Sequence, residues 1–141
     1  MINPEEFFDY KKPTVQMLGR WQPWHDGHTQ LFKKALTITG QVVIMVRDVF
    51  KYEGDAGAGR TAKQDDNPFG MIQTIEGIEN GLREHGYENG REYLIIEVPN
   101  IVDISFGRGV GYTFTEHDLG EDIHKISATS IRAQMREEGK L

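Results

Sequence analysis

Apolar residues fall into two kinds of pattern along the first hundred positions of the chain. Short, largely continuous apolar runs cover residues 14–18, 41–46 and 93–98, as expected for strands buried in a parallel sheet. Between them, apolar residues recur at helical spacing over 31–38 and 71–82, which indicates a helix after each of the first two strands. The order strand, helix, strand, helix, strand predicts an α/β fold with a parallel sheet.

The later part of the chain extends this architecture. The glycine-rich residues 100–120 contain strand pieces, and an amphipathic segment that follows Ser127 predicts a capped C-terminal helix. We therefore expect a single Rossmann-like domain over residues 1–141, with about five parallel strands and helices on both faces of the sheet. Residues 1–13 form an N-terminal extension of that domain. Ligands of such sheets bind beyond the carboxyl ends of the strands.

Residues 48–66 show neither helical nor strand spacing. Several glycines lie among charged residues here, which predicts a long mobile loop of the kind that often serves as a lid. Lys51, Arg60 and Lys63 could then close over phosphates, although a solvated charged loop explains them as well. Asn67 is predicted to cap the second helix, ahead of a proline in its first turn.

The composition narrows the class of protein. With 38% hydrophobic and 27% charged residues, the 141-residue chain has the composition of a soluble globular domain. The net charge of −6 argues against broad nucleic-acid binding, whereas a few local cations could still hold a small anion. The chain has no cysteine, no apolar run long enough for a bilayer and no signal-peptide core near Met1. We therefore expect a cytoplasmic protein without a membrane partner.

The string GRWQPWHDGH lies between the first strand and its helix, at the predicted ligand-binding edge. Gly19 allows a phosphate to approach the backbone, and Gly27 lets the chain enter the helix without a side chain in the way. His28 falls in the first helical turn, where free amide groups and the helix dipole attract anions. His25 and His28 can donate hydrogen bonds to phosphate oxygens, and Arg20 can add a bidentate contact. These residues predict a phosphate site.

Other roles for these side chains stay open. A histidine near a helix start is commonly a cap or a surface residue, and His25 with His28 could instead form a metal pair. Asp26 would point elsewhere and no other nearby residue completes the ligand set, so we expect no dedicated metal site. Trp21 and Trp24 could stack on a base or cover the site, but packing in the core is the commoner role of such side chains.

A second string, ISATSIR, opens the predicted C-terminal helix. Ser127, Thr129 and Ser130 offer hydroxyl groups to phosphate oxygens, and Arg132 adds a fixed positive charge one turn into the helix. An ordinary Ser/Thr cap on a terminal helix would show the same residues. The presence of both strings in this order favours the phosphate-binding interpretation.

These two strings resemble the signatures of a known superfamily. HDGH is similar to the HxGH signature of the nucleotidyltransferases, which include cytidylyltransferases, phosphopantetheine adenylyltransferase and nicotinamide mononucleotide adenylyltransferases. The longer string, with Gly-Arg-x-Gln-Pro ahead of the histidines, is most similar to the archaeal-type nicotinamide mononucleotide adenylyltransferases. The resemblance spans residues 14–138, and the stretch Asn67-Pro68-Phe69 also resembles a segment of those enzymes.

The resemblance implies roles for individual residues. In that family the two histidines contact the triphosphate, which implies this role for His25 and His28, with Arg132 as the third catalytic residue. Mg²⁺ would bridge the phosphate oxygens and keep most of its own waters. The implied nucleotide-binding positions are Gly19, Arg20, Trp21, Gly27, Ser127, Thr129 and Ser130.

The implied reaction is in-line attack of an acceptor oxyanion on the α-phosphorus of ATP or CTP, with release of pyrophosphate. Arg47 ends the second strand and could hold the acceptor phosphate, although a solvated arginine is equally expected there. Arg108 lies among three glycines, as a ligand contact or as part of a plain turn. The interval between Pro99 and Ser127 is shorter than in the mononucleotide adenylyltransferases. A sugar, polyol or alkyl phosphate, or a phosphonate, is therefore at least as plausible an acceptor as nicotinamide mononucleotide.

Two other classes of function stay open. A non-catalytic nucleotide-binding module would bind a triphosphate without releasing pyrophosphate. A structural domain would use both strings only as helix caps and would bind no nucleotide. Apart from the nucleotide and its acceptor, the partner that we consider is a second copy of the chain, because members of the superfamily are often oligomers.

Overall fold

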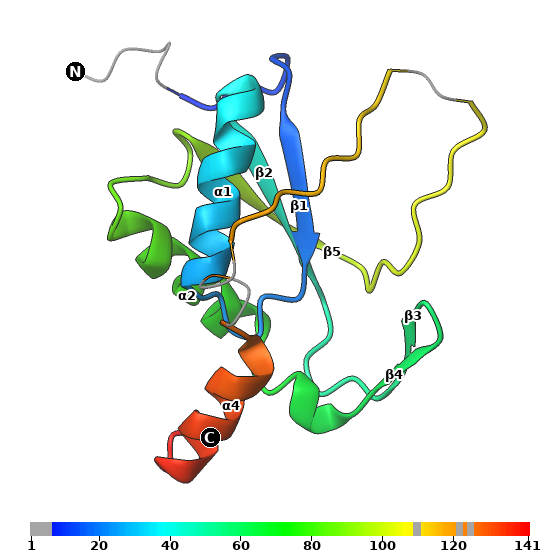
Figure 1. Cartoon of the computed structure of the whole chain (residues 1–141), viewed down its shortest axis with the longest axis vertical. Coiled ribbons are helices and arrows are strands. Elements are labelled where there is room, and N and C mark those ends of the chain that lie inside the picture. The colour runs from blue at the N-terminus through cyan, green and yellow to red at the C-terminus, as the bar shows by residue number, and fades with distance from the viewer. Residues whose placement is uncertain (1–6, 109–110, 121–122, 124–125) are drawn as a thin grey trace.

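A three-stranded parallel sheet forms the centre of the molecule (Figure 1). The computed structural model describes residues 7–108, 111–120, 123 and 126–141. The strands lie in the order β1 (Val15–Gly19), β2 (Val42–Arg47) and β5 (Tyr93–Val98). They correspond to the three apolar runs of the sequence, so the predicted α/β fold with a parallel sheet is confirmed.

Helices α1 (Asp26–Thr39) and α2 (Met71–Arg83) cover one face of this sheet. α1 connects β1 to β2, and α2 connects β2 to β5, so both connections run in the same direction across the sheet. Because both crossovers are right-handed, the two helices lie on the same side of the sheet. α1 ends at Gly40, whose φ of 86° is a left-handed conformation that glycine adopts without strain. The two helices and the strands share one core, formed by Met17, Trp21, Trp24, Phe32, Ala35, Val42, Ile44, Val46, Ile78, Leu82 and Tyr93.

Two features of the predicted sheet are wrong. In the described part of the chain it has three parallel strands rather than about five, and its two crossover helices share one face. Residues 100–108 and 111–120 form no strand. Their large apolar side chains stay exposed instead of joining the core, and these are Val102, Ile104, Phe106, Tyr112 and Phe114.

Residues 48–66, predicted as a loop without regular structure, contain an antiparallel hairpin. Strands β3 (Gly54–Gly57) and β4 (Arg60–Ala62) are joined by two residues with φ of 54° and 75°, as in a tight two-residue turn. A 3-10 turn at Gln64–Asp66 follows. Backbone hydrogen bonds hold the hairpin together, and Ala62 is the one buried residue of its two strands. The sequence of the hairpin therefore shows no alternation of apolar and polar residues that would have predicted strands.

The described part of the N-terminal extension and the C-terminal helix lie towards opposite ends of the strands (Figure 1). The buried side chain of Gln41 holds the N-terminal extension near the amino ends of the strands, with hydrogen bonds of 2.7 Å to Asp9 O and to Thr14 Oγ1. Residues 1–6 of that extension lie outside the described residues. Helix α4 (Ala128–Glu137) begins after Ser127, which confirms the predicted C-terminal helix. Among the described helices, none is long and apolar enough to cross a membrane.

Candidate functional site

His25 and His28 cap the start of α1 reciprocally. The backbone N–H of His25 donates to Nδ1 of His28 at 3.1 Å, and the backbone N–H of His28 donates to Nδ1 of His25 at 3.4 Å. The two rings stack with their centroids 3.6 Å apart and an interplanar angle of 16°. Because each Nδ1 accepts a hydrogen bond, the proton of each neutral ring lies on Nε2. Each imidazole therefore keeps one Nε2–H donor for a ligand.

Burial keeps both imidazoles neutral near pH 7. Burial, together with the positive charge of a protonated His25, lowers the pKa of His28 to about 3. Burial also lowers the pKa of His25, although Asp26 opposes that shift. The histidines are therefore neutral hydrogen-bond donors in the ligand-free protein, and the fixed positive charge of the site must come from arginines. A polyphosphate bound against the rings would raise their pKa values again.

The glycines of this string have a packing role that the sequence did not reveal. A Cβ atom at Gly27 would lie 2.8 Å from Cε1 of His25, so glycine makes room for the stacked ring. A Cβ atom at Gly19 would lie 2.8 Å from two carbons of the Trp21 indole. Both positions thus need glycine for close internal contacts. Contact with a phosphate at either position stays a prediction.

Arg132 of α4 reaches the first string from a distance of 110 residues along the chain. Its side chain is 3% exposed and donates to the backbone O of Gln22 at 2.7 Å and to Oγ1 of Thr129 at 3.3 Å. A carboxylate oxygen of Asp66 lies 3.7 Å away. The structure therefore joins the two predicted strings through this arginine.

Three arginines gather near the carboxyl ends of β1 and β2. Burial lowers the pKa of Arg47 and that of Arg132, and the positive charge of Arg20 lowers both further. Arg47 donates to Oδ1 of Asn100 at 2.7 Å. Within the described residues, the Nε–H groups of Arg47 and Arg132 are buried without a hydrogen-bond partner. An anion at this cluster would relieve the mutual repulsion and could satisfy donors that are otherwise costly to bury.

One of the three hydroxyl-bearing residues at the start of α4 caps the helix. Ser127 is the helix cap, since its Oγ accepts from the backbone N–H of Ser130 at 3.1 Å. Ser127 Oγ also donates to Oγ of Ser130 at 2.8 Å. Thr129 and Ser130 are exposed. The capping role considered for this string is confirmed for Ser127, and phosphate binding by all three hydroxyl groups stays a prediction.

The segment 67–69 is a part of this site that sequence reasoning missed. Asn67 does not cap α2, which begins at Met71 with Gly70 as its cap. Its side chain is fully buried and accepts a hydrogen bond of 2.8 Å from Arg20. The signal available in the sequence was the resemblance of the stretch Asn67-Pro68-Phe69, which an ordinary helix start explained equally well.

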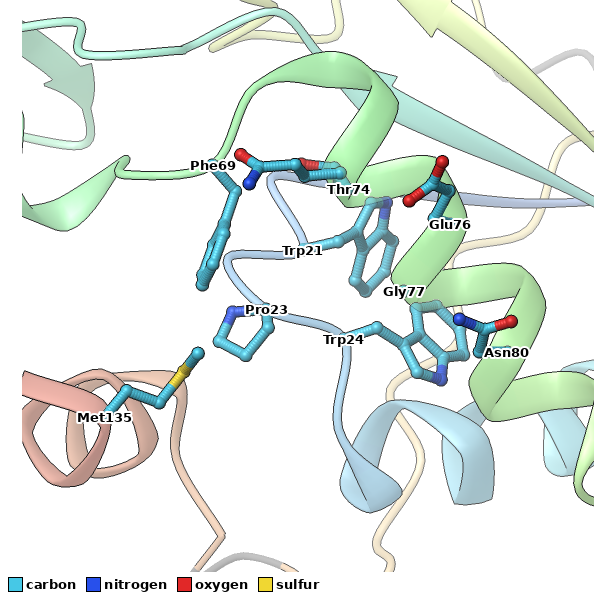
Figure 2. A pocket seen from close by; sticks show the side chains of 10 residues that line it. Trp21, Pro23, Trp24, Phe69, Thr74, Glu76, Gly77, Asn80 and Met135 are labelled. Atoms are coloured by element: carbon cyan, nitrogen blue, oxygen red, sulfur yellow. The ribbon is translucent and has the colours of Figure 1, made fainter. Parts of the chain in front are cut away.

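A cavity of about 280 Å³ opens beside the first string, between α2 and Met135 of α4 (Figure 2). The indoles of Trp21 and Trp24 form part of its wall but are 6% and 8% exposed, because both belong to the core. Their N–H groups point away from solvent. Trp21 donates to the backbone O of Met45 at 3.1 Å, and Trp24 donates to Oγ1 of Thr29 at 2.8 Å. Contact of Trp21 with a nucleotide stays a prediction.

The remaining predicted cations are exposed. Arg108 is exposed in the segment after β5, which extends away from the sheet in Figure 1, and two residues of its glycine-rich string, 109 and 110, are outside the described part. Arg60 and Lys63 are exposed at β4 and directly after it, and Lys51 lies over the ring of Phe50. Among the described residues, no group of three or more histidine or acidic side chains could hold a metal ion.

Comparison with known proteins supports a relationship to nucleotidyltransferases. No protein-family profile matches the chain. Over 84 residues it is 31% identical to a nicotinamide-nucleotide adenylyltransferase of Saccharolobus solfataricus. The matched stretch is 60% of this chain and 42% of that enzyme, so the chain spans less than half of the relative's length.

Proposed function

We propose that this protein is a nucleotidyltransferase, which transfers a nucleoside monophosphate from a nucleoside triphosphate to a phosphorylated acceptor and releases pyrophosphate. The observation that carries the proposal is the arrangement of two stacked imidazoles, each with an Nε2–H donor, at a helix start that the buried Arg132 joins to the half-buried Arg20 and Arg47. A helix start, neutral donors and fixed cations together suit a polyphosphate. The partial similarity to an adenylyltransferase supports the same reaction class.

In the proposed reaction, an oxygen of the acceptor phosphate attacks the α-phosphorus of the nucleotide in line with the leaving group. The new P–O bond forms as the bond to the β-phosphate breaks, and pyrophosphate leaves with that electron pair. The acceptor oxygen is already ionised, so no covalent intermediate and no strong base are required. Catalysis then consists of positioning and of stabilising the charge that develops on the phosphates.

Each part of the site has a proposed role in this step. The Nε2–H groups of His25 and His28 donate to the α- and β-phosphate oxygens, and Arg20 and Arg132 balance the charge of the departing pyrophosphate. Mg²⁺ would enter with the nucleotide and would supply positive charge to its phosphates. Since the described residues offer no cluster of metal ligands, the ion would keep several waters, as Mg²⁺ commonly does. The remaining proposed nucleotide contacts are Gly19, Trp21, Gly27, Ser127, Thr129 and Ser130.

Arg47 is the proposed contact for the acceptor phosphate. It ends β2, lies in the arginine cluster and has a buried Nε–H without a partner among the described residues. Arg108 is a second proposed contact, which requires its exposed segment to approach the site. The proposed acceptor is a sugar, polyol or alkyl phosphate, a phosphonate or nicotinamide mononucleotide. The proposed donor is ATP or CTP.

Thermal shift with ATP, CTP, GTP and UTP, each with and without Mg²⁺, tests the proposal. A nucleotide at about 100 times its dissociation constant adds roughly 2.7 kcal/mol of stability, which is readily measured. We expect a shift with ATP or CTP that falls in His28→Ala and stays in His85→Ala, a matched change at an exposed histidine. The nucleotide that binds is then tested for pyrophosphate release with the acceptor classes above. Binding without release would indicate a non-catalytic nucleotide-binding module, and no binding by the wild type would refute the proposal.

A further inference from the structure

Asn67 directly follows the segment 52–66 and connects the arginine cluster to the start of that segment. Its Oδ1 accepts from Arg20 at 2.8 Å, and its Nδ2 donates to the backbone O of Tyr52 at 3.3 Å. Its own backbone O accepts from the backbone N–H of Lys51 at 2.9 Å. The residue is 0% exposed, so its amide cannot exchange these partners for water. One buried side chain therefore contacts the site on one side and closes the base of the hairpin segment on the other.

A second pair of contacts places this segment alongside the first string. Gln22 pairs with the backbone of Phe69, just as Arg20 pairs with Asn67, and both pairs are 47 residues apart in the sequence. Residues 20 and 22 of the first string thus contact residues 67 and 69, with one residue between the two contacts on each side. The segment 67–69 is therefore held in register with residues 20–22.

The charge around Arg20 explains why such a tether matters. Arg20 lies close enough to Arg47 and Arg132 to lower the pKa of each. A guanidinium among like charges favours positions further out in solvent, and a long arginine side chain has the rotamer freedom to reach them. The hydrogen bond to Asn67 opposes that motion. It keeps Arg20 in place before any anion arrives.

We propose that Asn67 is a positioning residue for the triphosphate site, which holds Arg20 within the arginine cluster and transmits occupancy of that site to residues 52–66. This inference rests on the proposed function. Because coupling between two sites is reciprocal, a triphosphate that orders Arg20 also stabilises the contacts of Asn67 with Lys51 and Tyr52. Ligand binding then protects the hairpin segment, although the segment need not touch the ligand.

A double-mutant cycle tests the positioning role. The dissociation constant of the magnesium complex of ATP or CTP, whichever binds, is measured for the wild type, Asn67→Ala, Arg20→Ala and the double variant. We expect Asn67→Ala to weaken binding by about tenfold, which corresponds to one charge-assisted hydrogen bond, and to have little further effect when Arg20 is absent. Unchanged binding in Asn67→Ala, or losses that multiply in the double variant, would overturn the inference alone. A wild type that binds no nucleotide would overturn the proposed function.

Limited proteolysis tests the coupling without altering the buried amide. Trypsin cleaves after exposed basic residues, and Arg60 and Lys63 lie within the hairpin segment. We expect saturating nucleotide to slow cleavage after both residues in the wild type and in Arg83→Gln, a control change at an exposed arginine of α2. In Arg20→Gln at saturating nucleotide this protection should disappear. Equal protection in Arg20→Gln would show that the segment responds to the ligand by another route and would overturn the proposed link.

Discussion

The side chain of Gln22 forms two hydrogen bonds with the backbone of Phe69, in the manner of a neighbouring strand. Its Nε2 donates to the carbonyl O of Phe69 at 3.0 Å, and the N–H of Phe69 donates to its Oε1 at 2.9 Å. The backbone O of Gln22 also accepts the hydrogen bond from Arg132. A residue that is 4% exposed thus joins the first string, the start of α2 and the C-terminal helix.

Gln22→Ala should lower the free energy of unfolding by about 2–4 kcal/mol, because it leaves the N–H and C=O of Phe69 without their partners. Gln22→Glu keeps the acceptor but buries a carboxylate and places its oxygen against the carbonyl O of Phe69, so we expect a loss at least as large. Urea denaturation of the two variants and the wild type measures both values. Equal stability of Gln22→Ala and the wild type would show that water replaces the pairing.

Two glycines of α2 should respond in opposite directions to the same substitution. A Cβ atom at Gly77 meets no atom within 4 Å, so Gly77→Ala should raise the free energy of unfolding by about 0.5–1 kcal/mol through helix propensity. A Cβ atom at Gly81 would lie 2.8 Å from Cδ1 of Trp24, and Gly81→Ala should lower it by about 1–3 kcal/mol. Thermal or urea unfolding of this matched pair measures both. Destabilisation by both alanines would contradict the open space at Gly77.

The low pKa of His28 should make stability depend on pH below neutrality. The unfolded chain binds a proton at His28 below about pH 6.5, whereas the folded protein does not until the pH approaches about 3. The stability that depends on a neutral His28 is therefore fully present above pH 6.5 and is lost as the pH falls towards 3. This one group lowers the free energy of unfolding by no more than about 1.4 kcal/mol per pH unit. Urea unfolding at several pH values should show a shallower decline in His28→Gln. Parallel declines in the two proteins would place the titration elsewhere.

Arg132→Lys should separate the geometry of this arginine from its charge. A lysine keeps the positive charge but cannot serve both Gln22 O and Thr129 Oγ1 with a planar guanidinium, so we expect a loss of about 1–3 kcal/mol in stability. The thermal shift produced by ATP or CTP should also decrease. Arg83→Lys, an exposed position in α2, serves as the control and should change stability by less than about 0.5 kcal/mol. Equal effects of the two substitutions would argue against a special role for Arg132.

Local patterns in the sequence were sufficient for the elements that depend on nearby residues. The apolar runs predicted β1, β2 and β5, and the helical spacing predicted α1 and α2. Each of these elements buries its apolar side chains, and their spacing along the segment shows which kind of element it is. The pairing of His25 and His28 follows from a separation of three residues at a helix start. The cap at Ser127 was likewise readable from the residues around it.

Tertiary structure decided everything that joins distant segments. The sequence could not show that Asn67 holds Arg20 instead of capping a helix, because their contact spans 47 residues and both types are common at surfaces. It placed Arg47 and Arg108 equally near the acceptor, whereas the fold brings Arg47 into the arginine cluster and leaves Arg108 exposed. The hairpin, the number of strands and the shared face of α1 and α2 were also missed. The physical reason is that a hydrogen bond or a charge contact depends on where two chain segments meet in space, and a one-dimensional pattern records burial but not the partner.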